Sequence, residues 1–309
     1  MMAREPAIVV DRLLRRFGDL TAVNAISFTV QQGELFGIVG PDGAGKTTTL
    51  RMLAGVLPPT SGDANVFGTS VATNPEGVKP SLAYMSQRFG LYSDLTVAEN
   101  LRFYADLYDV SPAERTKRLE RLYQFSNLGP FQDRLAGNLS GGMKQKLGLS
   151  CALIHQPRVL LLDEPTFGVD PISRRDLWLI VHDMVAQGVT VIASTAYLDE
   201  AERFDRLALL HRGSILSMGT PDELRAQFPG TLVEIRPARP REAVKFLRDH
   251  PGVKSAVLFG DRIHLSLGSR HDWPDVERDL KSNGFAIEEA SPREPSLEDV
   301  FFESVGSAE

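Results

Sequence analysis

One glycine-rich segment constrains the fold of this chain more than any other. The stretch ELFGIVGPDGAGKTTTL (34–50) contains the pattern G-x-x-x-x-G-K-[ST], formed by Gly40, Gly45, Lys46 and Thr47. The apolar run before the pattern predicts a strand, and the residues after it predict a helix. This strand–loop–helix context identifies a phosphate-binding loop, or P-loop.

The loop offers several kinds of contact to a polyphosphate. Its glycines, Gly43 among them, let the backbone N–H groups turn inward, because no Cβ blocks the approach of the anion. Lys46 can reach the β- and γ-phosphates, and the Thr47 hydroxyl is placed to bind Mg²⁺. The expected nucleotide-binding residues of the loop are Gly40, Pro41, Asp42, Gly43, Ala44, Gly45, Lys46, Thr47 and Thr48.

A second element of the expected site is acidic. In RVLLLDEP (158–165), Asp163 ends an apolar strand, where a carboxylate is costly unless it meets a cation. We expect Asp163 to hold Mg²⁺ through water, and Glu164 to polarise an attacking water as general base. Acidic residues after a strand also cap helices, so the assignment depends on the presence of the P-loop.

Strand and helix patterns alternate along most of the chain, which predicts an α/β fold. The runs RVLLLD (158–163) and VTVIAS (189–194) are apolar on both faces, as parallel strands covered by helices are. Residues 96–151 contain no convincing long strand and predict a helical insertion.

The order of elements changes after a short linker at 229–231. The remaining pattern is β-α-β-β-α-β, which predicts a small ferredoxin-like α+β domain. We therefore expect one domain at 7–228 and an accessory or regulatory domain at 231–309. RNA-recognition domains share this order but stack bases on strand aromatics, and RIHLSL (262–267) has none. No regular metal-ligand spacing relates the histidines His250, His264 and His271.

The composition narrows the location and the partners. Asp and Glu number 40 against 34 Lys and Arg, and the net charge of -6 argues against nucleic acid as a partner. The single cysteine, Cys151, cannot form an internal disulfide, which fits a reducing cytoplasm. No apolar run approaches the about 20 residues that a membrane-spanning helix requires. Work at a membrane would therefore need another chain as anchor.

The stretch LSGGMKQK (139–146) resembles the signature motif of ATP-binding cassette (ABC) ATPases. Other motifs of that family stand around it in the family's order. Phe17 matches the aromatic residue that stacks on adenine, with Val23 beside it. Gln87 matches the Q-loop glutamine that touches Mg²⁺ and water and senses the membrane subunit.

The D-loop of the family is matched by FGVDP (167–171), with Asp170 at its acidic position. The resemblance covers roughly residues 7–228 and implies ATP and Mg²⁺ as cofactors. It implies an ABC cassette with a mostly parallel core sheet, antiparallel N-terminal strands and a helical signature subdomain at about 90–152.

The signature is expected to act across a dimer. Ser140, Gly141 and Gly142 begin a helix, and a helix N-terminus can bind an anion. The resemblance implies that they meet the γ-phosphate held on the P-loop of another subunit. That subunit would be a second copy of the chain or a different ABC ATPase.

More narrowly, the chain is similar to the nucleotide-binding subunits of type-two exporters. GVDPISRRDLW (168–178) resembles the first cassette of YbhF-type multidrug efflux ATPases, and PSLEDVFFESV (295–305) resembles endings in that exporter group. The resemblance implies an ATP-hydrolysing efflux subunit that works with separate integral membrane permease subunits. It would lie in the cytoplasm, on the inner face of the cell membrane. Candidate permease contacts, equally compatible with simple packing, are Phe89, Leu91 and Tyr92.

Two positions depart from the family pattern. Ala196 falls where most ABC ATPases have a histidine that hydrogen-bonds the γ-phosphate. We expect slowed rather than abolished hydrolysis, with Thr195 as a candidate substitute donor. Asp42 falls where relatives more often have Asn or Ser. An acid is unfavourable near polyphosphate, so we expect Asp42 to point outward or to cap the turn.

Two other functions stay open at the level of sequence. A weakly catalytic cassette could regulate through ATP-driven dimerisation instead of powering transport. A soluble ABC ATPase could act on ribosomes or DNA, but such relatives generally fuse two cassettes or insert long coiled coils. This chain has neither feature.

Overall fold

The computed structural model describes residues 5–87 and 90–306 of the chain. The chain divides into two compact units, Met1–Ile215 and Leu216–Glu309. The expected domain limits at 228 and 231 stay a prediction.

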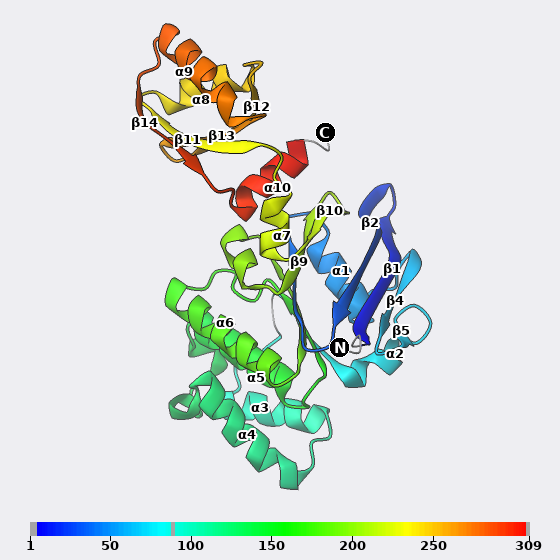
Figure 1. Cartoon of the computed structure of the whole chain (residues 1–309). Coiled ribbons are helices and arrows are strands. Elements are labelled where there is room, and N and C mark those ends of the chain that lie inside the picture. The colour runs from blue at the N-terminus through cyan, green and yellow to red at the C-terminus, as the bar shows by residue number, and fades with distance from the viewer. Residues whose placement is uncertain (1–4, 88–89, 307–309) are drawn as a thin grey trace. The chain divides into compact units, whose positions relative to one another are not determined.

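The first unit contains two sheets and a set of helices (Figure 1). Its strands are β1 (Pro6–Phe17), β2 (Leu20–Gln31), β3 (Leu35–Val39), β4 (Ser61–Val66), β5 (Thr69–Ser70), β6 (Leu82–Met85), β7 (Val159–Asp163), β8 (Thr190–Thr195) and β9 (Arg206–His211). Strand β10 (Ser214–Gly219) crosses into the second unit. The α-helices of the first unit are α1 (Lys46–Leu53), α2 (Pro75–Val78), α3 (Val97–Leu107), α4 (Pro112–Ser126), α5 (Gly141–Leu153) and α6 (Pro171–Ala186).

The larger sheet has the strand order β10-β9-β3-β8-β7-β6. The pairs that β3, β7 and β8 make with their neighbours are parallel, and every residue of these three strands is buried. The register places Val39 beside Thr195, and Asp163 beside Ser194. Because parallel strands end at one edge of a sheet, the P-loop, the acidic pair and the turn after β8 all begin at that edge.

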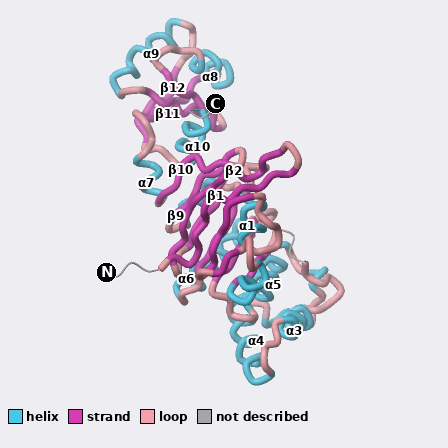
Figure 2. The backbone as a smooth tube through the Cα atoms, turned by 90° about the vertical axis from the view of Figure 1, so that its right-hand side faces the viewer, coloured by secondary structure: helices cyan, strands magenta, loops and turns pink. Residues whose placement is uncertain are grey.

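The second sheet of this unit is antiparallel, with the order β2-β1-β4-β5. Helix α1 contacts β7 and β8 of the parallel sheet and β2 of the antiparallel one. Helices α3, α4 and α5 lie between β6 and β7 in the chain, and α3 and α4 extend away from the β1–β2 ribbon (Figures 1 and 2). The predicted parallel core, antiparallel N-terminal strands and helical insertion are confirmed.

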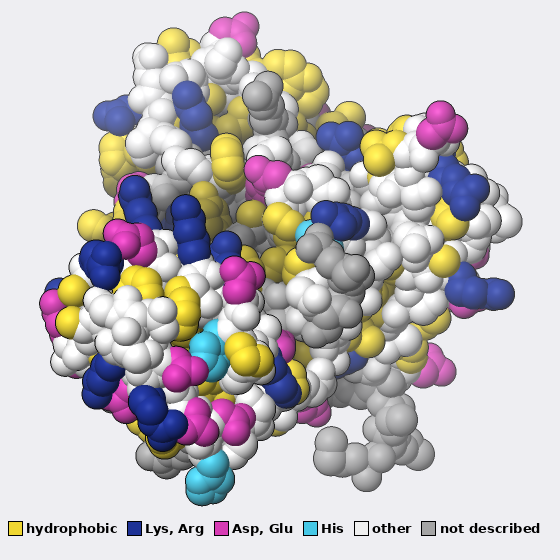
Figure 3. Space-filling model, turned by 90° about the horizontal axis from the view of Figure 1, so that it is seen from above, with side chains coloured by type: hydrophobic (Ala, Val, Ile, Leu, Met, Phe, Trp, Pro, Cys, Tyr) yellow, Lys and Arg dark blue, Asp and Glu magenta, His cyan; other side chains and the backbone are white. Residues whose placement is uncertain are grey.

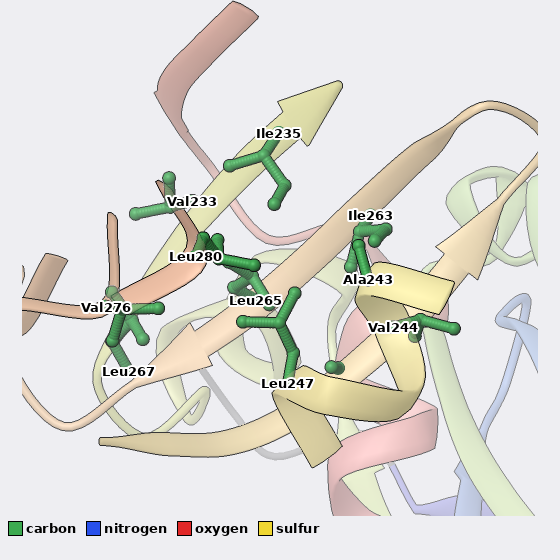
Figure 4. Close-up of a cluster of buried hydrophobic side chains, with 11 residues drawn as sticks. Val233, Ile235, Ala243, Val244, Leu247, Ile263, Leu265, Leu267, Val276 and Leu280 are labelled. Atoms are coloured by element: carbon green, nitrogen blue, oxygen red, sulfur yellow. The ribbon is translucent and has the colours of Figure 1, made fainter. Parts of the chain in front are cut away.

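The second unit follows the predicted β-α-β-β-α-β order. Its elements are α7 (Pro221–Ala226), β11 (Thr231–Pro237), α8 (Pro240–Arg248), β12 (Val253–Phe259), β13 (Arg262–Leu267), α9 (Trp273–Ser282), β14 (Ile287–Arg293) and a further helix α10 (Leu297–Gly306). The sheet order β12-β13-β11-β14 and its antiparallel pairs match the ferredoxin-like arrangement. Helices α8 and α9 supply Leu247 and Leu280 to an apolar core with strand residues such as Ile235 and Leu265 (Figure 4).

The other face of this sheet is polar where α10 meets it. His264 on β13 is buried, with Nδ1 2.6 Å from Asp299 Oδ1 and Nε2 3.0 Å from Glu234 Oε2. Burial raises the pKa of Asp299, but hydrogen bonds from His264 and Ser296 outweigh it and hold that pKa below its usual value. His264 is therefore part of the contact that holds α10 on the sheet.

Truncating a core side chain of the second unit should loosen that unit locally. Leu247 is fully buried, so Leu247→Ala should cost about 2–5 kcal/mol of its stability. Amide hydrogen exchange of the full chain should show faster exchange across 231–293 and unchanged exchange in β3, β7 and β8. Lys245→Ala, an exposed change on the same helix, is the matched control and should leave both regions unaltered.

Candidate functional site

The P-loop is fixed at the edge of the parallel sheet by close backbone contacts. The Gly40 N–H donates to the Thr195 carbonyl at 3.2 Å, which ties the start of the loop to the end of β8. A Cβ on Gly40 would lie 2.1 Å from the Leu210 carbonyl oxygen. Gly45 has φ 106°, and a Cβ there would lie 2.5 Å from the Ala22 oxygen. Both positions therefore require glycine.

Lys46 lies at the mouth of this loop and is almost completely buried. Its Nζ donates to the carbonyl oxygens of Gly40 and Pro41 at 2.7 and 3.0 Å, and it lies 3.0 Å from Glu164 Oε1. The ammonium is thus held by neutral carbonyls on one side and faces a carboxylate on the other. A phosphate that binds Lys46 would therefore share its ammonium with the Glu164 carboxylate.

Asp163 is held by three hydroxyl groups from three elements. Thr47 Oγ1 and Ser194 Oγ donate to its Oδ1 at 3.0 and 2.8 Å, and the Tyr84 hydroxyl donates to its Oδ2 at 3.1 Å. Burial, together with the negative charge of Asp163, raises the pKa of Tyr84 to about 12. Tyr84 therefore stays protonated and remains a donor at neutral pH.

Glu164 has a left-handed backbone, with φ 49°. Its N–H is close to both Ser194 oxygens, at 3.0 Å from Oγ and 3.2 Å from the carbonyl. Gln87 Nε2 donates to Glu164 Oε2 at 3.0 Å, while Lys46 faces Oε1. A non-glycine residue in this region is strained, and such strain is concentrated at functional sites.

Lys46, Gln87 and Glu164 lie in the lining of a pocket of about 490 Å³, whereas Asp163 is not among the described residues that line it. Phe17, which is 45% exposed, lies in the lining with Leu20 and Ala22. Val23, expected beside the adenine, is fully buried, and its Cγ2 lies 3.4 Å from where a Gly45 Cβ would be. The described residues that line the pocket are Phe17, Leu20, Ala22, Asp42, Gly43, Ala44, Gly45, Lys46, Thr47, Thr48, Gln87, Glu164 and Phe167. Asp42 is exposed at the lip of the loop.

The signature residues begin helix α5 and lie beside the D-loop of the same chain. Ser140 caps the helix by accepting a hydrogen bond from the Met143 N–H at 3.3 Å. A Cβ on Gly142 would lie 2.3 Å from Ser173 Cβ, so glycine allows α5 and α6 to approach here. Asp170 caps α6 by accepting from the Ser173 N–H, and this hydrogen bond lowers the pKa of Asp170.

None of the signature residues lies among the described residues that line the pocket. Ser140 and Gly141 are instead exposed, as is Asp170. They are available to a second molecule.

Ala196 is exposed and follows directly after β8, so no side-chain donor is presented there. The Thr195 hydroxyl before it donates to Glu200 Oε2 at 2.7 Å and accepts from the Tyr197 N–H at 3.0 Å. The one hydrogen of that hydroxyl is therefore used to hold the turn in place.

Glu200 is a buried carboxylate that no sequence motif indicates. Besides Thr195, Thr166 Oγ1 donates to its Oε2 and Trp178 Nε1 donates to its Oε1, each at 3.0 Å. Thr166 precedes the D-loop and Trp178 lies on α6, so one carboxylate connects both sides of the D-loop with the turn after β8.

Tyr84 and Ser194 were also missed in the sequence. Both lie within strand patterns whose apolar neighbours indicate burial alone. Ser194 does carry one sequence signal for a role in the site, which is a hydroxyl near the end of a buried strand. Of the candidate permease contacts, Tyr92 is 44% exposed, Leu91 is half-buried, and Phe89 lies outside the described residues.

Comparison with known proteins gives a consistent picture. Residues 23–167 match the family described as ABC transporter, and residues 219–305 match the family described as the C-terminal domain of DrrA1-3-like ATP-binding proteins. The chain is 43% identical over 98% of its length to the probable multidrug ABC transporter ATP-binding protein YbhF of Escherichia coli (strain K12). It spans 53% of the length of YbhF, about half of that relative.

Other relatives match along nearly their whole length. The Nod factor export ATP-binding protein I of Rhizobium sp. (strain N33) is 36% identical, with 97% of each chain covered. The daunorubicin/doxorubicin resistance ATP-binding protein DrrA of Streptomyces peucetius is 34% identical, with 97% of this chain and 92% of the relative covered. A solved structure of the ATP binding subunit of an ABC transporter matches with a TM-score of 0.65, at 32% identity, over 72% of this chain and 93% of that one.

The stabilising role of the buried Glu200 carboxylate can be tested by replacing it with an amide. Gln has one acceptor oxygen for the donors Thr166, Thr195 and Trp178, so Glu200→Gln should leave buried donors unpaired. We expect a loss of about 1–3 kcal/mol in the free energy of unfolding, measured by urea denaturation. Asp199→Asn, at a carboxylate that is 74% exposed, is the control and should change stability little. Equal effects of the two substitutions would contradict the role of Glu200.

Proposed function

The chain belongs to the ABC transporter family, and from that membership we propose that it is the ATP-binding and ATP-hydrolysing subunit of an efflux transporter. The observation that carries the proposal is the meeting of Lys46, Gln87 and Glu164 in the lining of a pocket that also contains the exposed ring of Phe17. An ammonium, an amide and a carboxylate within hydrogen-bond distance are the groups that phosphate binding and water activation require.

The residues around Asp163 fit Mg²⁺. Thr47 Oγ1 and Asp163 Oδ1 are hard oxygen donors 3.0 Å apart; Thr47 would bind the ion directly and Asp163 would hold it through water. When bound, Mg²⁺ supplies neutralisation of charge on the phosphate oxygens. Gln87 lines the same pocket as Thr47 and would contribute its amide oxygen.

Four residues of the pocket then have defined tasks: Lys46, Gln87 and Glu164 in hydrolysis, and Phe17 in holding the nucleotide. Lys46 binds phosphate oxygens without relocating, because Gly40 and Pro41 already hold its ammonium at the loop mouth. A bound phosphate would neutralise part of the charge on Lys46. The ion pair between Lys46 and Glu164 would then weaken, and Glu164 would be released from it. Glu164 can then accept a proton from an attacking water, which the Gln87 amide helps to orient. Phe17 stacks on the adenine.

We propose that the site is completed by a second chain. Ser140 and the N-terminus of α5 are exposed and lie away from the described pocket of their own chain, which supports contact with ATP on a partner. The partner is a second copy or another ABC ATPase. Closure around two ATP molecules and reopening after hydrolysis would then drive the transport cycle.

The membrane part of the transporter is a separate permease in this proposal. In the described parts of the chain, every helix is too short or too polar to span a bilayer. Exposed aromatics on the helical subdomain, including Tyr92 and Phe103, whose ring centroids lie 4.7 Å apart, support a docking face for the permease. The protein would act in the cytoplasm at the inner membrane face.

Nucleic acid is not part of the proposal. Acidic residues exceed basic ones, and the face drawn in Figure 3 carries positive and negative side chains interspersed.

Removing the proposed base should stop hydrolysis without stopping binding. Glu164→Gln keeps the size of the side chain but cannot accept the proton, so phosphate release should fall by at least about a hundredfold. Binding of a fluorescent ATP analogue should persist, because Lys46 and the P-loop are intact. Glu120→Gln, an exposed change on α4, should leave turnover unaltered. Undiminished phosphate release by Glu164→Gln would rule out this mechanism.

Restoring an imidazole after β8 should accelerate the reaction. A charge-assisted hydrogen bond to the γ-phosphate is worth about 1.5–3 kcal/mol. If it acts wholly in the transition state, Ala196→His should raise kcat roughly ten- to a hundredfold. Steady-state phosphate release at saturating ATP measures this directly, and Ala196→Gly serves as the control for a change of backbone freedom alone. A kcat equal to that of the parent would mean that the missing imidazole does not limit turnover.

A further inference from the structure

One buried side chain holds the loop at residues 92–96, which precedes helix α3. Asn100, on α3, is fully buried. Its Oδ1 accepts a hydrogen bond from the Tyr92 N–H at 3.0 Å. Its Nδ2 donates toward the carbonyl oxygens of Tyr92, Leu95 and Thr96, at 3.0, 3.3 and 2.9 Å. An amide has two N–H hydrogens, so these three acceptors share them.

The same loop is hydrogen-bonded on another side to the segment that precedes the signature. The Ala136 N–H donates to the Leu95 carbonyl and the Gly137 N–H to the Ser93 carbonyl, both at 2.8 Å. A Cβ on Gly137 would lie 2.9 Å from the Ser93 oxygen, which is closer than a side chain tolerates. The two backbone segments therefore approach as closely as glycine permits.

This second segment leads directly to the signature serine. Ser140 follows Gly137 by three residues, and between them the Leu139 N–H donates back to the Ala136 carbonyl at 3.3 Å. Ser140 then caps α5. The connection from residues 135–137 to Ser140 is short and is hydrogen-bonded within itself. A displacement of residues 135–137 should therefore also displace the N-terminus of α5.

We propose that Asn100 is a positioning residue for the signature motif. By fixing the 92–96 loop, Asn100 fixes residues 135–137, and through them the direction in which Ser140 faces a second chain. The inference rests on the proposed ATP-driven dimer. Contacts that cross such an interface depend on placement to within about 1 Å, so a loosened loop should weaken the dimer.

Nucleotide binding within one chain should not depend on Asn100. Neither Asn100 nor any residue of 92–96 or 135–140 is among the described residues that line the pocket. The positioning role therefore predicts a separation of two measurable quantities: weaker dimerisation with unchanged affinity of the monomer for nucleotide. A purely structural role would change both, or would change the melting temperature alone.

The test uses the full chain carrying Glu164→Gln, so that ATP persists. Asn100→Asp replaces the donor by a carboxylate oxygen that faces three carbonyl oxygens. At saturating Mg·ATP, analytical ultracentrifugation should show dimerisation weakened by about tenfold or more, equivalent to about 1.4 kcal/mol or more. Titration of the dilute monomer with a fluorescent ATP analogue should give the affinity of the parent.

Ser126→Ala is the matched control. Ser126 is also buried in the helical subdomain, but its hydroxyl donates to Leu122 within α4. This variant should lose stability and dimerise as the Glu164→Gln parent does. Dimerisation by Asn100→Asp equal to that of the parent overturns the proposal. A parent that does not dimerise with ATP overturns the proposed function instead.

A second variant decides the matter if Asn100→Asp does not fold. Gly137→Ala leaves Asn100 intact and presses on the Ser93 carbonyl from the other segment. It should weaken ATP-driven dimerisation in the same way and leave monomer binding unchanged. Unaltered dimerisation of Gly137→Ala would overturn the link between the loop and Ser140.

Discussion

The buried ion pair between Lys46 and Glu164 is the interaction on which the site depends. Their Nζ and Oε1 atoms lie 3.0 Å apart, and the two side chains are 4% and 9% exposed. Burying both charges costs desolvation that a packed apolar pair would not, so stability alone is a poor reason to keep them. The proposed mechanism gives a chemical reason to keep the pair, because in it Lys46 binds phosphate and Glu164 activates water. The parallel sheet makes the pair possible, because β3 and β7 end at the same edge.

The fold could be predicted from the sequence where it depends on local residue patterns. The apolar run that ends at Asp163 forms β7 (Val159–Asp163), a strand that is buried along its whole length. The P-loop motif fixes a strand–turn–helix unit by itself, and the C-terminal order gives the ferredoxin-like sheet. These features depend on residues that are near one another in sequence. The family resemblance then supplied which motifs belong together, which periodicity cannot do.

The contacts that complete the site were not predictable in the same way. Tyr84 donates to Asp163, which lies 79 positions away in the sequence. Asn100 bonds to backbone groups of the 92–96 loop, and no sequence pattern shows which side chain a backbone group will contact. Val23 illustrates a finer limit. Residues alternate between the faces of β2, so Ala22 lines the pocket while Val23 is buried beneath the loop. Which of two neighbours faces a ligand depends on strand register, and register is set by the partner strand.

Ala196 raises the question of what holds the turn after β8 in a chain that lacks the usual imidazole. The Thr195 hydroxyl donates its hydrogen to Glu200 and accepts a hydrogen bond from the Tyr197 N–H. The guanidinium carbon of Arg174 lies 4.4 Å from the centroid of the Tyr197 ring. The turn is thus fixed from within the chain and needs no phosphate to become ordered. Glu200 joins it to both sides of the D-loop, so any movement of α6 at a dimer interface would carry the turn with it. With Ala196 in place of an imidazole, the connection between the turn and the D-loop through Glu200 is still present.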